Sequence, residues 1–152
     1  MNSLKIFRLA EKIPVVGTRF FSWALSQVAP YFSSIHAHVE QLQPNYVRVS
    51  LKKRRSVQNH LKTVHAIAMC NMAELAGGLM TEVSIPKGSQ WIPVGMTVKY
   101  LKKAKTDLVA EAKGDGLDWQ HAKEVIVPVE VRDNNNILVF TAHITMSLKH
   151  ST

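Results

Sequence analysis

Glu74 is the only Lys, Arg, Asp or Glu residue in the apolar run 65–80. The run is rich in Ala, Met and Leu, which favour an α-helix, and nothing before Gly77 and Gly78 interrupts one. At about 100° per residue, its apolar side chains spread over well more than half of the circumference, which is typical of a helix enclosed by protein. A carboxylate held there must be paired, hydrogen-bonded or neutralised, and such acids in clefts are candidate catalysts. Glu74 is therefore a candidate nucleophile or general base, or else a structural acid that pairs with a basic residue across a subunit interface.

Small or polar residues surround Glu74 on the predicted helix: Cys70, Asn71, Gly77 and Gly78 lie three or four positions away. This pattern predicts free space beside the carboxylate. Cys70 could be a nucleophile, but no histidine lies one turn away to take its proton, so we expect it to be a packing residue. As the only cysteine, it excludes an internal disulfide and a cysteine zinc site and favours a reducing compartment, the cytoplasm.

Residues 3–35 predict a helical arm that is broken at Pro14 and Gly17 and ends near Pro30. The same breakers, together with Arg19, argue against a membrane-spanning helix in this segment. We expect the arm to pack on the rest of the chain. Docking on a membrane surface through its aromatic side chains, Phe20, Phe21 and Trp23, is the alternative.

The remaining elements are predicted to be strands. Extended runs at 38–42 and 46–51 flank Pro44 and Asn45, which suit a hairpin turn. Beyond the long helix, runs of β-branched and aromatic residues alternate with turn residues and predict antiparallel strands at 82–85, 91–101, 106–114, 124–132 and 137–149. Because neighbouring runs are close in sequence, we expect a meander without crossover helices.

The chain has 152 residues, of which 46% are hydrophobic and 20% charged, and this is the size and composition of one globular domain. We divide it into an N-terminal arm, residues 1–36, and a domain, residues 37–152. His36 and His38 would share one face of a strand, but no third ligand lies nearby in the sequence, so we expect no metal site.

Nineteen Lys and Arg residues against eleven Asp and Glu residues give a net charge of +8, which favours anionic partners. The basic residues form two clusters, Lys52, Lys53, Arg54 and Arg55, and Lys99, Lys102, Lys103 and Lys105. Neither cluster is interleaved with aromatic residues, so we do not expect nucleic-acid binding. They are either solvated strand ends or the walls of a site for phosphates.

Asn59-His60-Leu61-Lys62-Thr63-Val64-His65-Ala66, followed by Glu74, resembles a motif of the hotdog-fold acyl-CoA thioesterases of the phenylacetic-acid-degradation type. Those proteins carry N-x-x-x-T-x-H-G-G and then a helical Asp or Glu. The run 96–105 is similar to their strand that leads into a turn facing coenzyme A. The resemblance covers about residues 37–149 and implies an α+β hotdog fold, a long central helix wrapped by a curved antiparallel sheet, here with an N-terminal helical arm.

The resemblance implies a role for each residue of the motif. Glu74 would be the catalytic carboxylate, Asn59 would position the thioester or water, His65 would belong to the loop that enters the helix, and the Ala66 amide would form the oxyanion site. Arg54, Arg55, Lys102, Lys103 and Lys105 would bind coenzyme A, which enters as part of the substrate, so no separate cofactor is expected.

The sequence departs from the family pattern after the histidine, where the two glycines are Ala66 and Ile67. A backbone N–H at a helix N-terminus can polarise a carbonyl whatever its side chain, so Ala66 retains the donor, whereas Ile67 narrows the space nearby. We expect an acyl-CoA thioesterase. A hotdog protein that binds acyl-CoA without cleaving it is the alternative. Gly77 and Gly78 could admit an acyl chain or only let a strand pack closely.

Helix geometry predicts that one site needs two chains. Nine positions separate His65 from Glu74, which turns the two side chains roughly 180° apart. One helix cannot present both to one substrate, whereas a symmetric dimer can pair the helix entrance of one copy with Glu74 of the other. We therefore expect a homo-oligomer, a dimer or a dimer of dimers, without integral membrane association.

Overall fold

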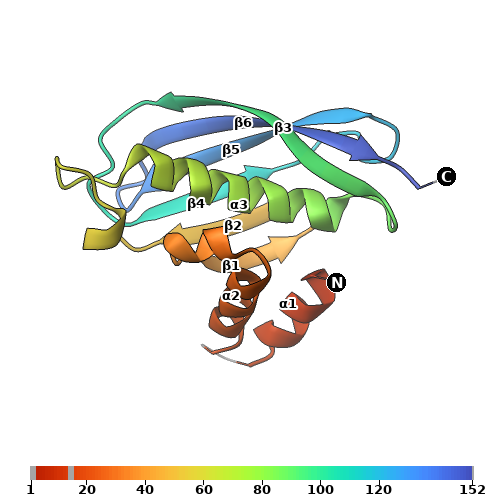
Figure 1. Ribbon diagram of the computed structural model, residues 1–152, viewed down its shortest axis with the longest axis horizontal. Coiled ribbons are helices and arrows are strands. Elements are labelled where there is room, and N and C mark those ends of the chain that lie inside the picture. The colour runs from red at the N-terminus through yellow and green to blue at the C-terminus, as the bar shows by residue number, and fades with distance from the viewer. Residues whose placement is uncertain (1–2, 14–15, 152) are drawn as a thin grey trace.

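The computed structural model describes residues 3–13 and 16–151. Its centre is the helix α3 (Ala66–Ser84), which lies in the concave face of one curved sheet (Figure 1). Two short helices, α1 (Ser3–Glu11) and α2 (Gly17–Val28), and the 3-10 turn η1 (Pro30–Ser34) form an arm beside the sheet. A long central helix wrapped by a curved antiparallel sheet, with a helical arm, is the fold that the sequence predicted.

The sheet has six strands in the order β1-β2-β4-β5-β6-β3, and all neighbours are antiparallel. Their bounds are β1 (His38–Gln43), β2 (Tyr46–Leu51), β3 (Gln90–Tyr100), β4 (Leu108–Lys113), β5 (Glu124–Asp133) and β6 (Leu138–Lys149). The prediction of a simple meander is wrong at β3, which follows β2 through α3 and pairs with β6 at the opposite edge. β1 and β3 are therefore the two edges of the sheet.

The predicted strand at 82–85 is also wrong, because α3 continues to Ser84. The Ile85 amide still donates to the Thr81 carbonyl at 3.0 Å, and the Thr81 hydroxyl donates to the Gly77 carbonyl at 2.8 Å. Leu79 and Met80, in the last turns of the helix, are buried in the core. This tertiary packing outweighs the weak strand preference of Val83.

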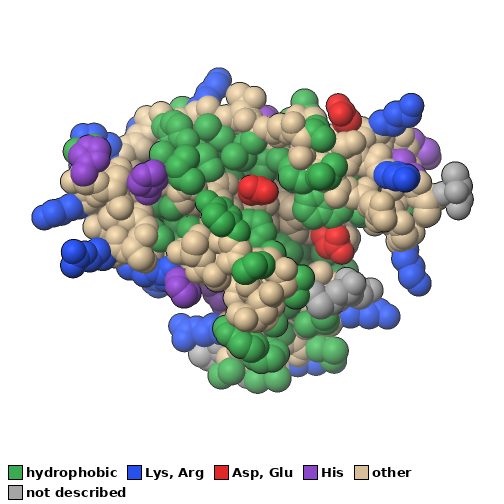
Figure 2. Space-filling model, in the orientation of Figure 1, with side chains coloured by type: hydrophobic (Ala, Val, Ile, Leu, Met, Phe, Trp, Pro, Cys, Tyr) green, Lys and Arg blue, Asp and Glu red, His purple; other side chains and the backbone are tan. Residues whose placement is uncertain are grey.

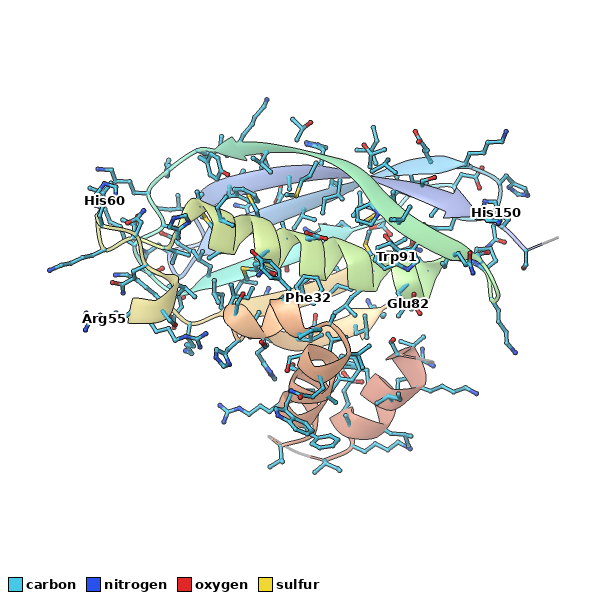
Figure 3. All side chains as sticks on the ribbon, in the orientation of Figure 1. Phe32, Arg55, His60, Glu82, Trp91 and His150 are labelled. Carbon is cyan, nitrogen blue, oxygen red and sulfur yellow. The ribbon has the colours of Figure 1, made fainter. Side chains whose placement is uncertain are left out.

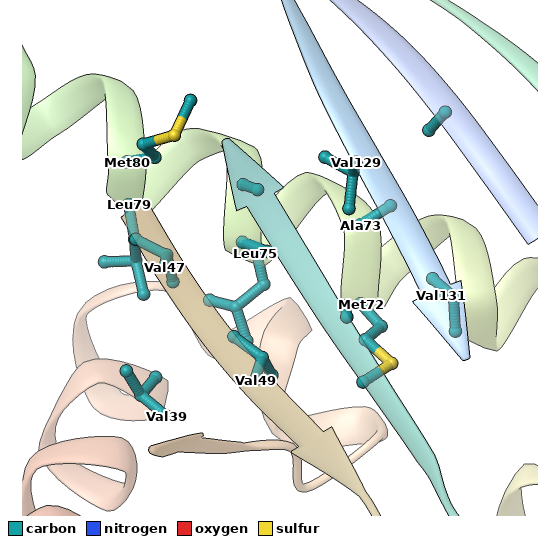
Figure 4. Packing of buried hydrophobic residues seen from close by; sticks show 14 of the residues in the cluster. Val39, Val47, Val49, Met72, Ala73, Leu75, Leu79, Met80, Val129 and Val131 are labelled. Carbon is teal, nitrogen blue, oxygen red and sulfur yellow. The ribbon is translucent and has the colours of Figure 1, made fainter. Parts of the chain in front are cut away.

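The core lies between α3 and the concave face of the sheet. Every second residue of β2 and β4 is buried, as the period of a strand with one covered face requires. Figure 4 shows Leu75 and Leu79 of α3 close to Val47 and Val49 of β2. Packing on the sheet therefore fixes the orientation of α3.

The arm contacts the β1 edge. The Val39 amide donates to the Ser22 hydroxyl at 3.0 Å, and Phe7 packs edge-on against Phe21 with ring centroids 5.1 Å apart. The predicted break at Pro14 lies outside the described residues, and Gly17 begins α2. The division of the chain at residue 36 stays a prediction. Among the described residues, no helix has the length and apolar character that crossing a membrane requires.

Candidate active site around the central helix

The N-terminus of α3 is held by the loop 57–65. The His65 amide donates to the Val57 carbonyl at 2.8 Å, and the Val64 amide donates to the Ala104 carbonyl at 2.9 Å. His65 is the N-cap of α3, where its Nδ1 accepts from the Ile67 amide at 3.0 Å. Among the described residues, no hydrogen-bond partner occupies the Ala66 amide. A free N–H therefore stands at the positive end of a 19-residue helix, which suits an incoming oxygen atom.

Asn59 closes the loop that leads to this helix end. Its Oδ1 accepts from the Leu61 amide at 3.0 Å and from the Thr63 amide at 3.1 Å, while its Nδ2 donates to the Thr63 hydroxyl at 2.9 Å. These bonds fix the loop conformation, including the positive φ of 56° at Lys62. In this structure Asn59 acts on the loop, and its contact with a thioester or water stays a prediction.

Glu74 lies on the face of α3 that the sheet does not cover. Its side chain is exposed, so the prediction of an enclosed carboxylate is wrong for a single chain. Twelve of the 19 residues of α3 are buried, but Ile67 is 55% exposed and Cys70 is half-buried on the same open side. Figure 2 shows one isolated acidic group among hydrophobic side chains over the middle of α3. The carboxylate is thus accessible from solution at a largely apolar surface.

Gly77 and Gly78 are positions where other elements approach α3 closely. A Cβ on Gly77 would lie 2.9 Å from Cδ1 of Ile144, and one on Gly78 would lie 2.9 Å from the ring of Trp91. Gly77 therefore lets the sheet approach, and Gly78 lets Trp91 of β3 pack on the helix. Close packing therefore occurs at both glycines, and the admission of an acyl chain beside Gly78 stays a prediction.

Tyr100 is a neighbour of the site that sequence reasoning did not identify. Its hydroxyl lies 3.3 Å from the Cys70 sulfur, one helical turn from both Ala66 and Glu74. The hydrogen bond to Cys70, followed by partial burial, raises the pKa of Tyr100 above its usual value. Tyr100 therefore stays a neutral hydrogen-bonding group at physiological pH.

A largely apolar groove of about 370 Å³ begins at Glu74 and runs toward the C-terminal end of α3. It is walled by the arm, by α3 and by the start of β3, through Leu25, Val28, Ala29, Phe32, Leu75, Gly78, Leu79, Trp91 and Pro93. Glu82 borders it as well and accepts a hydrogen bond from Nε1 of Trp91 at 2.8 Å. Figure 3 shows Phe32, Trp91 and Glu82 along this side of the helix.

The two basic clusters meet near the opposite end of α3. The Lys52 ammonium pairs with Asp107 at 2.8 Å, and the Lys53 amide donates to the same carboxylate at 2.8 Å, so the segments 52–55 and 99–107 lie together. Because Lys52 and the Lys53 amide bond its charged form, the pKa of Asp107 is lowered. Figure 3 places Arg55 and His60 at the end of the molecule where α3 begins.

The basic residues predicted to bind phosphates differ in their exposure and in the hydrogen bonds that they already make. Arg54 is half-buried, and its guanidinium donates to the Ile35 carbonyl at 2.6 Å and to the Ser56 hydroxyl at 2.8 Å. Arg54 therefore ties the end of the arm to the loop. Arg55 and the lysines of the loop after β3, Lys102, Lys103 and Lys105, are exposed. Their contact with a coenzyme stays a prediction.

Comparison with known proteins places the chain in a family. Residues 17–148 match the model of a domain of unknown function, DUF4442. The chain belongs to the DUF4442 family. The crystal structure of the structural-genomics protein APC5556 superposes on it with a TM-score of 0.88 at 44% identity, covering 98% of this chain and 99% of that chain. No curated protein matches the chain.

More distant solved structures carry the same fold as this DUF4442 protein. The thioesterase HI1161 of Haemophilus influenzae superposes with a TM-score of 0.72 at 14% identity, covering 82% of this chain and 87% of that chain. A variant of the thioesterase SAV0944 of Staphylococcus aureus superposes with a TM-score of 0.70 at 14% identity, covering 80% and 99%. The resemblance to hotdog-fold thioesterases that the sequence indicated is thereby confirmed at the level of the fold.

The DUF4442 match begins at residue 17, so it includes α2 and η1. Sequence reasoning predicted that this arm packs on the chain, or docks on a membrane surface, and assigned it no part in the site. Four wall residues of the groove beside Glu74 come from this part of the chain. Their apolar periodicity in α2 and the aromatic Phe32 after Pro30 were visible in the sequence. That they reach α3 depends on tertiary packing, which the local pattern does not encode.

Proposed function

We propose that this protein is a thioester hydrolase that acts on acyl-CoA or a related acyl thioester. Two groups along α3 support this most. The Ala66 amide at the helix N-terminus has no hydrogen-bond partner among the described residues, and the exposed Glu74 borders an apolar groove. The amide would stabilise the developing oxyanion. Glu74 would attack the carbonyl carbon or take a proton from an attacking water, and the thiol of coenzyme A would leave.

The site would be shared between two copies of the chain. His65 precedes α3 with an extended backbone, so the predicted half-turn between His65 and Glu74 does not apply. Ala66 and Glu74 are eight residues apart within α3, about 12 Å along the helix axis, so one thioester carbonyl cannot meet both in a single chain. The β3 edge offers a surface for a second copy, because it exposes apolar side chains, Ile92 at 62% and Val94 at 56%. Among the described residues, β3 pairs with β6 on one side and with no strand on the other. An open edge of this kind invites pairing with another strand. The proposal therefore includes a homodimer, or a dimer of dimers.

The two ends of α3 would receive the two ends of the substrate. The exposed basic side chains near the helix N-terminus, Arg55, Lys102, Lys103 and Lys105, suit the phosphates of coenzyme A. The apolar groove beside Glu74 suits the acyl group, since its walls are aliphatic and aromatic. Arg54 would contribute by holding the loop in place. We expect the protein to work in the cytoplasm.

Ile67 favours one alternative, a protein that binds acyl-CoA without cleaving it. Its side chain follows the Ala66 amide directly and occupies space that a glycine would leave open. If the thioester carbonyl cannot reach the amide, binding remains but the oxyanion loses its donor.

A thiol-release assay over acyl-CoAs of short, long and aromatic chains tests the proposal. We expect turnover of at least one, and in Glu74→Gln a loss on the order of a hundredfold or more in kcat with binding and melting temperature near wild type. Glu124→Gln, an exposed acid at the start of β5, is the matched control and should keep full activity. Binding of acyl-CoA without release of the thiol would support the alternative, a protein that binds acyl-CoA and does not cleave it. Full activity in folded Glu74→Gln would refute the catalytic role of Glu74.

A further inference from the structure

The arm has two apolar faces, and only one of them is covered. Phe7 and Ala10 of α1 and Phe21 of α2 are buried between the two helices and the sheet. A second set of apolar side chains points outward and is exposed: Ile6, Leu9, Ile13, Val16, Phe20 and Trp23. A surface helix that packs on a domain needs one apolar stripe, so the second stripe calls for another explanation.

The exposed side chains recur at helical spacing, three or four residues apart along each half of the arm. Leu9 is 63% exposed, Phe20 60% and Trp23 58%, and the rings of Phe20 and Trp23 lie 5.6 Å apart. Figure 2 shows hydrophobic side chains at the protruding outer end of the arm, on the side away from the sheet. They form one exposed apolar surface at the end of the molecule.

Positive charge surrounds this surface. Arg8, Lys12 and Arg19 are exposed between the apolar positions, and the salt bridges of the described residues include none of the three. The segment 3–28 has four basic residues and a single acid, Glu11. Apolar and aromatic side chains flanked by Arg and Lys are the composition of helices that lie in a membrane interface.

We propose that the outer face of the arm docks on the surface of an anionic lipid bilayer. Leu9, Phe20 and Trp23 enter the boundary between headgroups and acyl chains, while Arg8, Lys12 and Arg19 contact headgroup phosphates. The body of the protein stays in water, because the described helices are too short or too polar to cross the bilayer. This docking does not depend on the proposed hydrolysis.

Flotation with vesicles tests the proposal on the full chain. Wild-type protein should float with vesicles that contain phosphatidylglycerol, should float far less with pure phosphatidylcholine, and should be released as salt is added. Phe20→Ser with Trp23→Ser should lower binding by about tenfold or more, and the charge variant Arg8→Gln with Arg19→Gln should lower it to a similar extent. Ile126→Ser, which removes an apolar side chain 56% exposed on β5, and Lys149→Gln are the matched controls and should bind like wild type.

Several results would overturn the docking. Wild-type protein that stays with neither kind of vesicle, or that binds neutral vesicles equally well, would contradict an anionic bilayer as the partner. A smaller particle in light scattering for Phe20→Ser with Trp23→Ser would instead make this face a contact between copies of the chain. Because the charge variant leaves every apolar contact intact, it keeps the test valid if the aromatic variant does not fold.

Discussion

The two faces of α3 have different surroundings in the same helix. On one face Met72, Ala73 and Ala76 are fully buried against the sheet. On the other, Ile67 and Glu74 are open to solvent although most of the neighbouring side chains are apolar. The sheet therefore buries one face of the helix and leaves the other face exposed. Stability should depend on the packed face, and chemistry and assembly on the open one.

The two edges of the sheet repeat this contrast. At β1 the arm covers the edge through bonds such as that from the Val39 amide to Ser22. At β3 the outer edge has no strand partner in the part of the chain that the structure describes, and the six consecutive residues from Ile92 to Thr97 are exposed. Among residues 3–13 and 16–151, a covering element lies at the β1 edge and none at the β3 edge. Trp91 belongs to β3, and its ring packs on α3 at Gly78, so it connects the β3 edge with the open face of the helix.

Truncating the packed face should have the largest effect. Met72→Ala removes a fully buried side chain and leaves a cavity, which should lower the free energy of unfolding by about 2–5 kcal/mol. Ile67→Ala, the matched truncation on the open face, should change it by no more than about 0.5 kcal/mol. Urea unfolding of both variants measures the difference. Equal losses of unfolding free energy in the two variants would mean that the open face of α3 is packed against protein in solution.

Removing the positive charges of Lys102 and Lys103, near the N-terminus of α3, should affect substrate binding and leave stability unchanged. Lys102→Gln with Lys103→Gln should raise the KM for acyl-CoA by about tenfold and leave kcat unchanged, because phosphate contacts act on ground state and transition state alike. Lys123→Gln with Lys149→Gln removes the same charge elsewhere on the surface and should leave KM near wild type. An equal rise in KM for an uncharged cysteamine thioester would argue against phosphate contacts.

A change far from α3 should have the smallest effect, and it should depend on pH. Glu111 accepts hydrogen bonds from the Tyr46 hydroxyl at 2.6 Å and from Arg48 at 2.8 Å, and these bonds lower its pKa below the ordinary 4.5. Because the pKa is lowered in the folded protein, ionised Glu111 stabilises the fold at pH values above about 4.5. This contribution to the free energy of unfolding is lost as the pH falls through the pKa of the folded state. Glu111→Gln should therefore cost about 1 kcal/mol at neutral pH and progressively less below about 4.5. Thermal melts over this range measure it, and a constant difference at every pH would contradict the charge assignment.

Much of the fold was predictable because its signals are local. The start of α3 after His65 and the alternation of β2 and β4 follow from periods of 3.6 and 2. The position of β3 does not, since strand order depends on how α3 crosses the sheet. Residues 82–84 are helical because Leu79 and Met80 are buried in the core, and local propensity does not encode that packing.

The candidate site was predictable as a motif and not as a surface. Asn59, His65, Ala66 and Glu74 stand at the spacing of the motif, and the structure places them at the loop and helix as expected. Glu74 is exposed because the sheet does not cover that face of α3, and a helical wheel does not show which face the sheet covers. Tyr100 approaches Cys70 from a strand thirty residues away, so sequence spacing could not reveal it.

The central claim is that one site takes the Ala66 amide from one copy and Glu74 from another. Ala66→Pro removes this amide at a first helical position, where proline is tolerated, and His65 has the extended backbone, φ −65° and ψ 140°, that precedes proline readily. Alone, Ala66→Pro and Glu74→Gln should each be folded and nearly inactive. Mixed in equal amounts and allowed to exchange subunits, they should recover about a quarter of wild-type thioester hydrolysis, since half of the dimers then carry one intact site. A mixture that exchanges subunits and stays inactive would contradict the shared site.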